Sequence, residues 1–315
     1  MSKILVTGSI AYDILLNYDG SFADTIGGAD LNNLSVSFLS PRFARHHGGT
    51  GSNIAWNLRL LGTEAMLVGT IGNDGGEYRD LLKKRGVDVS QVQQLQDHVT
   101  STAIIGTDDA ERQIAFFHPG ADAYGTWPDL KDDCDDVAYA VVGARNPGLM
   151  MQGVHFCQEY KIPYLFDPGQ LVIGLGADEL KSAALKSGGL IANEFEWELL
   201  SEKTGCGISD FLVSTPFIIV TLGEKGLAIH TKKGEQVIPA CAAEKVVNPT
   251  GAGDALRAGL LTGLSKKWNL ADCGRLGAAI ASFVVEQEGT LLDTLDLDEV
   301  GERAKRAYGI SLPSL

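Results

Sequence analysis

Residues 246–255 read VVNPTGAGDA, and the apolar spacing of residues 255–264 after them predicts a helix. The two glycines, Gly251 and Gly253, let the chain bend sharply and let an anion approach the backbone. The first turn of a helix leaves N–H groups without partners and carries the positive end of the helix dipole. This turn therefore predicts an anion site. Asp254, at the start of the helix, is either a simple cap or a reacting carboxylate.

The segments around this turn alternate between strand and helix patterns. Short apolar runs, typical of strands buried on both faces, lie at 4–8, 65–69, 137–142, 164–167, 190–192 and 217–222. Helical patterns lie at 52–61 (with Ser52 as the expected N-cap), 77–85, 149–160, 178–186, 253–264, 270–286 and 298–308. Such alternation predicts an α/β fold with a parallel sheet covered on both faces.

Two regions interrupt the alternation, roughly 13–47 and 98–122. In the second region, runs rich in Thr, Ile and Phe are separated by Asp108 and Asp109, which predicts a β-hairpin. We expect both regions to form a small β-sheet lid over the main domain. The alternative is that their strands lie at the edge of the main sheet.

The composition excludes several classes of protein. The chain has 315 residues and a net charge of −14, with 40 acidic against 26 basic residues and no basic stripe, so no nucleic-acid partner is expected. No run reaches the ~18 apolar residues of a membrane span, and the N-terminus lacks a signal-peptide pattern. The five cysteines are far apart, as is typical of reduced thiols. We therefore expect a cytoplasmic protein without membrane contact.

The segment NPTGAGDA at 248–255 resembles the C-terminal signature of the ribokinase-like (PfkB) family of carbohydrate and nucleoside kinases. The resemblance implies a single domain over residues 1–315, built as a three-layer α/β/α sandwich with a mostly parallel central sheet and the small lid. It implies that Asp254 takes a proton from the attacking hydroxyl. The amides implied in the anion hole are those of Gly251, Ala252 and Gly253. Asn248 stands where the family usually has Asp, which leaves K⁺ activation open.

A second glycine-rich turn, HGGTGSN at 47–53, is similar to the family's N-terminal G-G-x-x-x-N signature. The resemblance implies that Gly48 and Gly49 let a substrate sugar approach the backbone and that Asn53 bonds its hydroxyls. Asp13 matches the family Asp that grips two ribose hydroxyls, and a carboxylate suits a vicinal diol because it accepts two O–H bonds. The alternative for Asp13 is a turn residue.

Two further segments resemble the family's ATP side. In the N-x-x-E element, Asn193 and Glu196 are implied to organise Mg²⁺, and Glu196 acts through water because Mg²⁺ keeps several waters. The segment TLGEKG is similar to the T-x-G-x-x-G turn that borders ATP. The residues that it implies there are Thr221, Gly223 and Gly226. All these segments follow the family's order along the chain.

Three features favour a nucleoside as the acceptor. The stretch 281–290, ASFVVEQEGT, resembles one that adenosine kinases carry near the adenine of ATP, and Ala279 and Ser282 are implied at that adenine. Arg257 stands as in bacterial adenosine-kinase-like members. The lid carries Phe116, Phe117 and His118, with Phe38 and Phe43 nearby in sequence. Such rings, Phe116 first among them, are expected to stack on a nucleobase, which is worth about 1–3 kcal/mol. The alternative is that the lid aromatics are core residues.

These observations predict a kinase that uses ATP and Mg²⁺ to phosphorylate the 5′-hydroxyl of a nucleoside, with adenosine as the first candidate. The alternatives are a sugar kinase of the ribokinase or fructokinase type and a non-catalytic nucleoside sensor. The expected partners are a small-molecule nucleoside or sugar and ATP. The protein is expected to be a monomer or a homodimer.

Overall fold

The computed structural model describes residues 3–27 and 35–315. Its larger sheet contains β1 (Lys3–Thr7), β4 (Ala65–Ile71), β5 (Val92–Gln94), β8 (Val137–Val142), β9 (Tyr164–Phe166), β10 (Gly189–Asn193), β11 (Phe217–Thr221), β12 (Leu227–Thr231) and β13 (Gly234–Ile238). The spatial order is β13-β12-β11-β10-β9-β8-β1-β4-β5. Neighbours are parallel except at β11–β12 and β12–β13. The prediction of a mostly parallel sheet is therefore confirmed.

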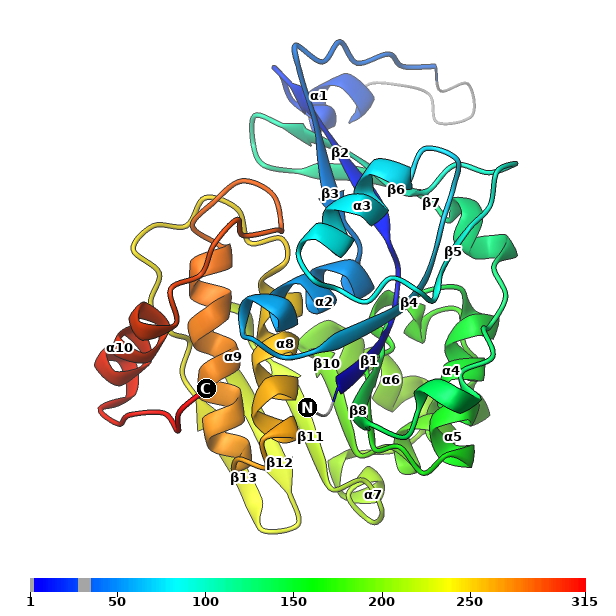
Figure 1. Ribbon diagram of the computed structural model, residues 1–315. Coiled ribbons are helices and arrows are strands. Elements are labelled where there is room, and N and C mark those ends of the chain that lie inside the picture. The colour runs from blue at the N-terminus through cyan, green and yellow to red at the C-terminus, as the bar shows by residue number, and fades with distance from the viewer. Residues whose placement is uncertain (1–2, 28–34) are drawn as a thin grey trace.

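Helices cover both faces of this sheet (Figure 1). One face packs against α2 (Thr50–Leu60), α3 (Gly76–Lys84), α8 (Ala252–Ser265), α9 (Leu270–Val284) and α10 (Leu297–Tyr308). The other packs against α4 (Pro147–Glu159), α5 (Ala177–Leu185), α6 (Glu194–Thr204) and α7 (Ile208–Phe211). In β1, Ile4 and Val6 enter the first core and Leu5 enters the second, because successive side chains of a strand point to opposite faces. The three-layer α/β/α sandwich is confirmed.

The seven helices predicted from apolar spacing are all present, with ends within two residues of the prediction. The sequence did not predict α1 (Phe22–Gly27), α6 and α7. Two of these are very short, and α6 is rich in Glu and shows little apolar periodicity. None of the described helices combines the length and the apolar character needed to cross a membrane.

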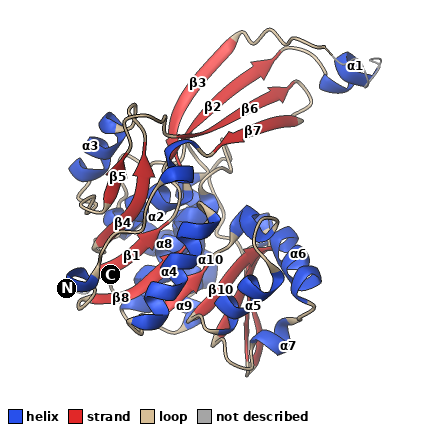
Figure 2. Ribbon diagram, turned by 90° about the vertical axis from the view of Figure 1, so that its right-hand side faces the viewer, coloured by secondary structure: helices blue, strands red, loops and turns tan. Residues whose placement is uncertain are grey.

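The lid strands form a sheet of their own. They are β2 (Ala11–Tyr18), β3 (Arg42–Gly48), β6 (Ser101–Asp108) and β7 (Gln113–His118), in the spatial order β3-β2-β6-β7. Figure 2 shows this sheet standing out from one end of the main body, with α1 at its far end. The alternative, that these strands extend the main sheet, is therefore wrong. Residues 28–34 of the predicted lid region lie outside the described residues.

The start of α2 corrects one prediction. Gly49, with φ of +98°, occupies the N-cap position, and a Cβ there would lie 2.6 Å from the backbone N of Ala11. The expected cap, Ser52, instead lies buried in the first turn, where its hydroxyl donates to the carbonyl of Gly48 at 2.6 Å. The helix starts earlier than predicted because a glycine can adopt the left-handed conformation where the lid strand turns into the helix.

Candidate active site

Asp254 meets Asn53 between two helices that pack side by side, α2 and α8 (Figure 1). The amide Nδ2 of Asn53 donates to Oδ2 of Asp254 at 2.8 Å, although the residues are 201 positions apart in sequence. Asp254 lies in the first turn of α8, and Asn53 in the first turn of α2. The structure thus brings together residues from the two glycine-rich motifs.

The turn before Asp254 has the shape expected of an anion site. Gly251 is the N-cap of α8 in the left-handed region, with φ of +85°. A Cβ at Gly251 would lie 2.9 Å from Cβ of Thr290, so the position has no room for a side chain. The N–H of Ala252 donates to the carbonyl of Pro249 at 3.3 Å, a long hydrogen bond that a stronger acceptor can replace. Glycine is required here by both conformation and space.

The pKa of Asp254 is raised to about 6, and burial of the carboxyl group is the main cause. The Arg257 guanidinium and the Asn53 hydrogen bond oppose this rise, whereas the carboxylates of Asp167 and Asp13 add to it. A carboxyl group with this pKa is mostly ionised at pH 7 and still basic enough to accept a proton. Gly251, and not Asp254, holds the N-cap position of α8, and a carboxyl group with this pKa can act as a general base.

Arg257 and Asp167 form a buried ion pair behind this turn. Nη2 of Arg257 donates to Oδ1 of Asp167 at 2.7 Å, and Nε donates to the other carboxylate oxygen. A Cβ at Gly253 would lie 2.8 Å from Nη1 of Arg257, which places the guanidinium against the backbone of the turn. The sequence analysis did not place Asp167 in the site. Its position directly after β9 could have indicated it, because parallel α/β sheets bind ligands at the carboxyl edge of their strands.

Asp13 lies where the lid joins the main body. Strand β2 pairs with β3 so that Asp13 is opposite His46 and Ala11 is opposite Gly48. A Cβ at Gly48 would collide with the Asp13 carboxylate, so glycine leaves room for this side chain. Burial raises the pKa of Asp13, and nearby His46 partly offsets the rise. Asp13 is close enough to Asp254 to raise the pKa of that base, so both carboxylates border one site.

The register of the lid decides which aromatic side chain shares the face of Asp13. Asp13 pairs with Ala103, which pairs with Phe117, so these three side chains lie on one face of the sheet. Phe116 pairs with Ile104 and therefore points to the opposite face. Adjacent strand residues alternate between faces, so Phe117 shares the face of Asp13 and Phe116 does not. Stacking of a base on Phe116 stays a prediction.

The residues expected at ATP lie at the ends of two adjacent strands. Asn193 ends β10 directly beside Thr221, which ends β11. Asn193 and Glu196 cap α6 reciprocally: the Glu196 N–H donates to Oδ1 of Asn193 at 2.7 Å, and the Asn193 N–H donates to Oε2 of Glu196 at 2.9 Å. Gly223 and Gly226 follow Thr221 in a short turn, both with positive φ. Together they form an edge with polar groups, and Glu196 on this edge is close enough to Arg257 and Asp167 for their charges to act on its carboxyl group.

Two residues expected at the adenine of ATP are buried in the structure. Ala279 is fully buried in the core, and Ser282 is 3% exposed. The Ser282 hydroxyl donates to the Ala279 carbonyl at 2.6 Å and accepts a hydrogen bond from Arg303 at 3.1 Å. Both residues are packed inside the helix layer, so neither side chain is open to a ligand. Thr290, at the end of the same stretch, lies against Gly251 at the anion turn.

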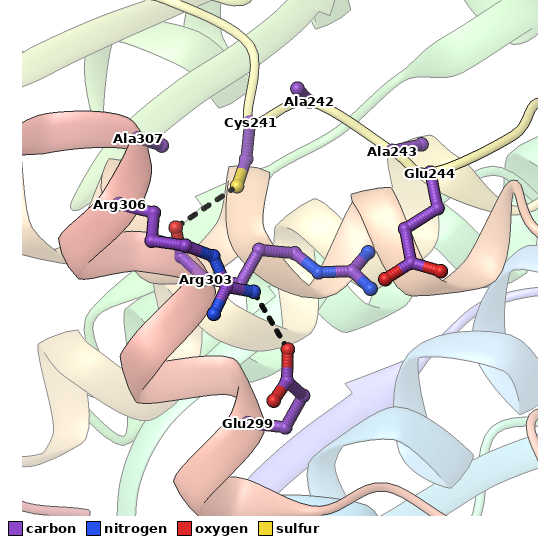
Figure 3. A pocket seen from close by; sticks show the side chains of 8 residues that line it. All are labelled: Cys241, Ala242, Ala243, Glu244, Glu299, Arg303, Arg306 and Ala307. Atoms are coloured by element: carbon purple, nitrogen blue, oxygen red, sulfur yellow. Dashed lines mark hydrogen bonds and ion pairs between the residues drawn. The ribbon is translucent and has the colours of Figure 1, made fainter.

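A pocket of about 570 Å³ lies between α10 and the segment that follows β13 (Figure 3). Its arginines are paired with carboxylates: Arg306 with Glu299 at 2.8 Å and Arg303 with Glu286 at 2.7 Å. It is lined by Cys241, Ala242, Ala243, Glu244, Glu299, Arg303, Arg306 and Ala307. The pocket does not include Asp254 or Asn53, so it is separate from the contact between the two glycine-rich motifs.

The chain is similar to known proteins over nearly its whole length. The family model described as "pfkB family carbohydrate kinase" matches residues 1–296. The chain is 30% identical over 308 residues to a nucleoside kinase of Methanocaldococcus jannaschii, covering 97% of this chain and 98% of that protein.

Solved structures of a nucleoside kinase from Burkholderia thailandensis are also similar to the chain. The complex with inosine has a TM-score of 0.88 at 31% identity, with coverage of 99% of this chain and 100% of that chain. The complex with ADP-inosine has a TM-score of 0.85 at 31% identity, with coverage of 99% and 98%. The similarity therefore extends over the lid as well as the main body.

Proposed function

Because the chain belongs to the pfkB family of carbohydrate kinases, we propose that it transfers the γ-phosphate of ATP to the 5′-hydroxyl of a purine nucleoside. Adenosine is the first substrate to test, and inosine stands beside it because the related Burkholderia protein was solved with inosine. The observation that carries the proposal is the position of Asp254. This base, with a pKa of about 6, lies in the first helical turn after Gly251 and bonds to Asn53 of the other glycine-rich motif.

In the proposed reaction, Asp254 accepts the proton of the 5′-hydroxyl as its oxygen attacks the γ-phosphorus in line. The Gly251, Ala252 and Gly253 amides, at the positive end of α8, stabilise the charge that develops on the phosphoryl oxygens. The Arg257 guanidinium behind the turn adds positive potential, although Asp167 neutralises most of it. The protein thus supplies position and electrostatics, which account for most of the catalysis in phosphoryl transfer.

Asp13 and Asn53 are proposed to hold the ribose, with Gly48 and Gly49 allowing it to approach the backbone. Asp13 offers two carboxylate oxygens to neighbouring hydroxyls. Its pKa is raised because burial removes water from the carboxyl group. Phe117 shares the Asp13 face of the lid and is 62% exposed. A base stacked on this ring would cover apolar surface that the lid otherwise leaves in water.

ATP is proposed to lie along the edge formed by Asn193, Thr221 and the glycine turn after it. Glu196 uses one carboxylate oxygen in the helix cap, and the other remains available for water bound to Mg²⁺. Oxygen donors of this kind fit Mg²⁺, which would neutralise phosphate charge when bound. The proposal does not include a K⁺ ion. Asn248 is not charged, and its Oδ1 already accepts the Thr250 N–H at 2.9 Å.

The test is an assay of ADP release by the purified protein with Mg-ATP and adenosine, inosine, guanosine, cytidine, ribose or fructose. The Asp254→Asn variant is the control for phosphate transfer. The proposal expects rapid release only with nucleosides and loss of that release in the variant. Release only with a free sugar would keep the role of Asp254 and replace the substrate. Ligand binding without ADP release would favour a sensor.

A further inference from the structure

Thr290 joins three parts of the site. It follows α9 in a turn and is 2% exposed. Its hydroxyl lies 2.8 Å from Oδ1 of Asn53 and 2.9 Å from the carbonyl of His47, at the end of lid strand β3. Its Cβ packs beneath Gly251 of the anion turn. The Thr290 side chain therefore contacts the lid at His47, the Asn53 amide that bonds Asp254, and Gly251 of the anion turn.

The chemistry of the Asn53 amide makes the hydroxyl important. An amide has an NH₂ donor on one side and an oxygen acceptor on the other. The ionised carboxylate of Asp254 can only accept, so the NH₂ group must face it. The oxygen then faces Thr290, whose hydroxyl is the donor that satisfies it. If the Asn53 amide were rotated by 180°, its Oδ1 would face Oδ2 of Asp254, and two acceptors would meet without a hydrogen between them.

We propose that Thr290 is a positioning residue whose hydroxyl holds the Asn53 amide in the orientation that presents NH₂ to Asp254. The inference rests on the proposed role of Asp254 as the base. The His47 carbonyl can only accept, so it shares the same hydroxyl proton. The orientation of the amide is thereby linked to the position of the lid strand.

A pH profile separates positioning from simple packing. Four other charged or titratable groups surround Asp254: Asp13, Asp167, Arg257 and Tyr78. These four residues are the same in every variant at position 290. The Asn53 hydrogen bond lowers the pKa of Asp254, so weakening that bond raises it. The acid limb of kcat/KM should therefore move to higher pH.

Four residues at position 290 form the experiment, because they separate the hydroxyl from the methyl group. Wild-type Thr290 and Thr290→Val differ chiefly in the hydroxyl, and so do Thr290→Ser and Thr290→Ala. Each protein is assayed for kcat, for KM of nucleoside and ATP, for the pH profile and for thermal unfolding. If one pair is unstable, the other pair still isolates the hydroxyl.

The proposal expects kcat to fall about tenfold in Thr290→Val and Thr290→Ala, with little change in KM for ATP and an acid limb at higher pH. Thr290→Ser should keep most of the activity and the wild-type pH profile. Equal losses in Ser and Ala, with Val unaffected, would show that the methyl group matters and would overturn the proposal. Asp254→Asn is assayed in parallel: if it kept full turnover, the role of Asp254 would fail, independently of Thr290.

Discussion

Replacing Asp254 by Asn should stabilise the protein while abolishing most of its activity. The folded state disfavours the ionised form of this carboxyl group, since its pKa is raised from the ordinary 3.8 to about 6, mainly by burial. Protonation therefore favours folding. That contribution is fully present below about pH 3.8 and is lost as the pH rises through 6. The neutral amide of Asp254→Asn never carries this charge, and its oxygen can still accept from Asn53.

The size of the effect follows from the pKa. A rise from 3.8 to about 6 corresponds to about 3 kcal/mol at pH 7, at about 1.4 kcal/mol for each pH unit. For a chain of this length, about 2 °C of Tm accompanies each kcal/mol, so Asp254→Asn should melt about 6 °C higher at pH 7. Near pH 4 the difference should nearly vanish. The loss of a general base should lower kcat about 10²- to 10⁴-fold.

The test measures thermal unfolding of the wild type and Asp254→Asn between pH 4 and pH 8, and ADP release by both at pH 7.5. Asp254→Ala is the matched control, because it removes the charge but leaves the Asn53 NH₂ without an acceptor, so its gain in Tm should be smaller. A difference in Tm that does not depend on pH, or a less stable Asp254→Asn, would refute the electrostatic reasoning. Normal turnover by Asp254→Asn would refute its role as the base.

Four further substitutions test other parts of the site. Asp167→Asn leaves the Arg257 guanidinium buried without its charged partner and should cost about 3–5 kcal/mol in urea unfolding, whereas a loss below 1 kcal/mol would contradict this. Phe117→Ala should raise the nucleoside KM about tenfold and leave the KM of ATP unchanged. Phe116→Ala should not, and equal effects would show that the lid register does not decide stacking. Gly251→Ala should lower kcat by at least tenfold because of its positive φ and the contact with Thr290, and near-normal kcat would show that the turn adapts.

The fold class and the glycine turn at 251–254 could be predicted from local sequence patterns. Buried parallel strands are apolar along their whole length, so their positions could be read without tertiary information. The glycines at 251 and 253, followed by Asp254 at the start of a helix, carry a local chemical meaning, because the anion site depends on backbone amides of consecutive residues. The order of the motifs along the chain then predicted that the substrate side precedes the ATP side.

The contacts between distant residues could not be predicted, because they depend on how the layers pack. The Asn53–Asp254 contact spans 201 residues and the Arg257–Asp167 pair spans 90, and no local pattern encodes either distance. The lid register, set by pairing between strands, decides between neighbouring aromatic residues because a shift of one position reverses the face. In the same way, Ser282 is buried within α9, whereas Thr290, six residues beyond the end of that helix, meets Asn53. Consecutive residues decide the chemical character of each local segment, whereas the partners of each side chain depend on how the layers pack.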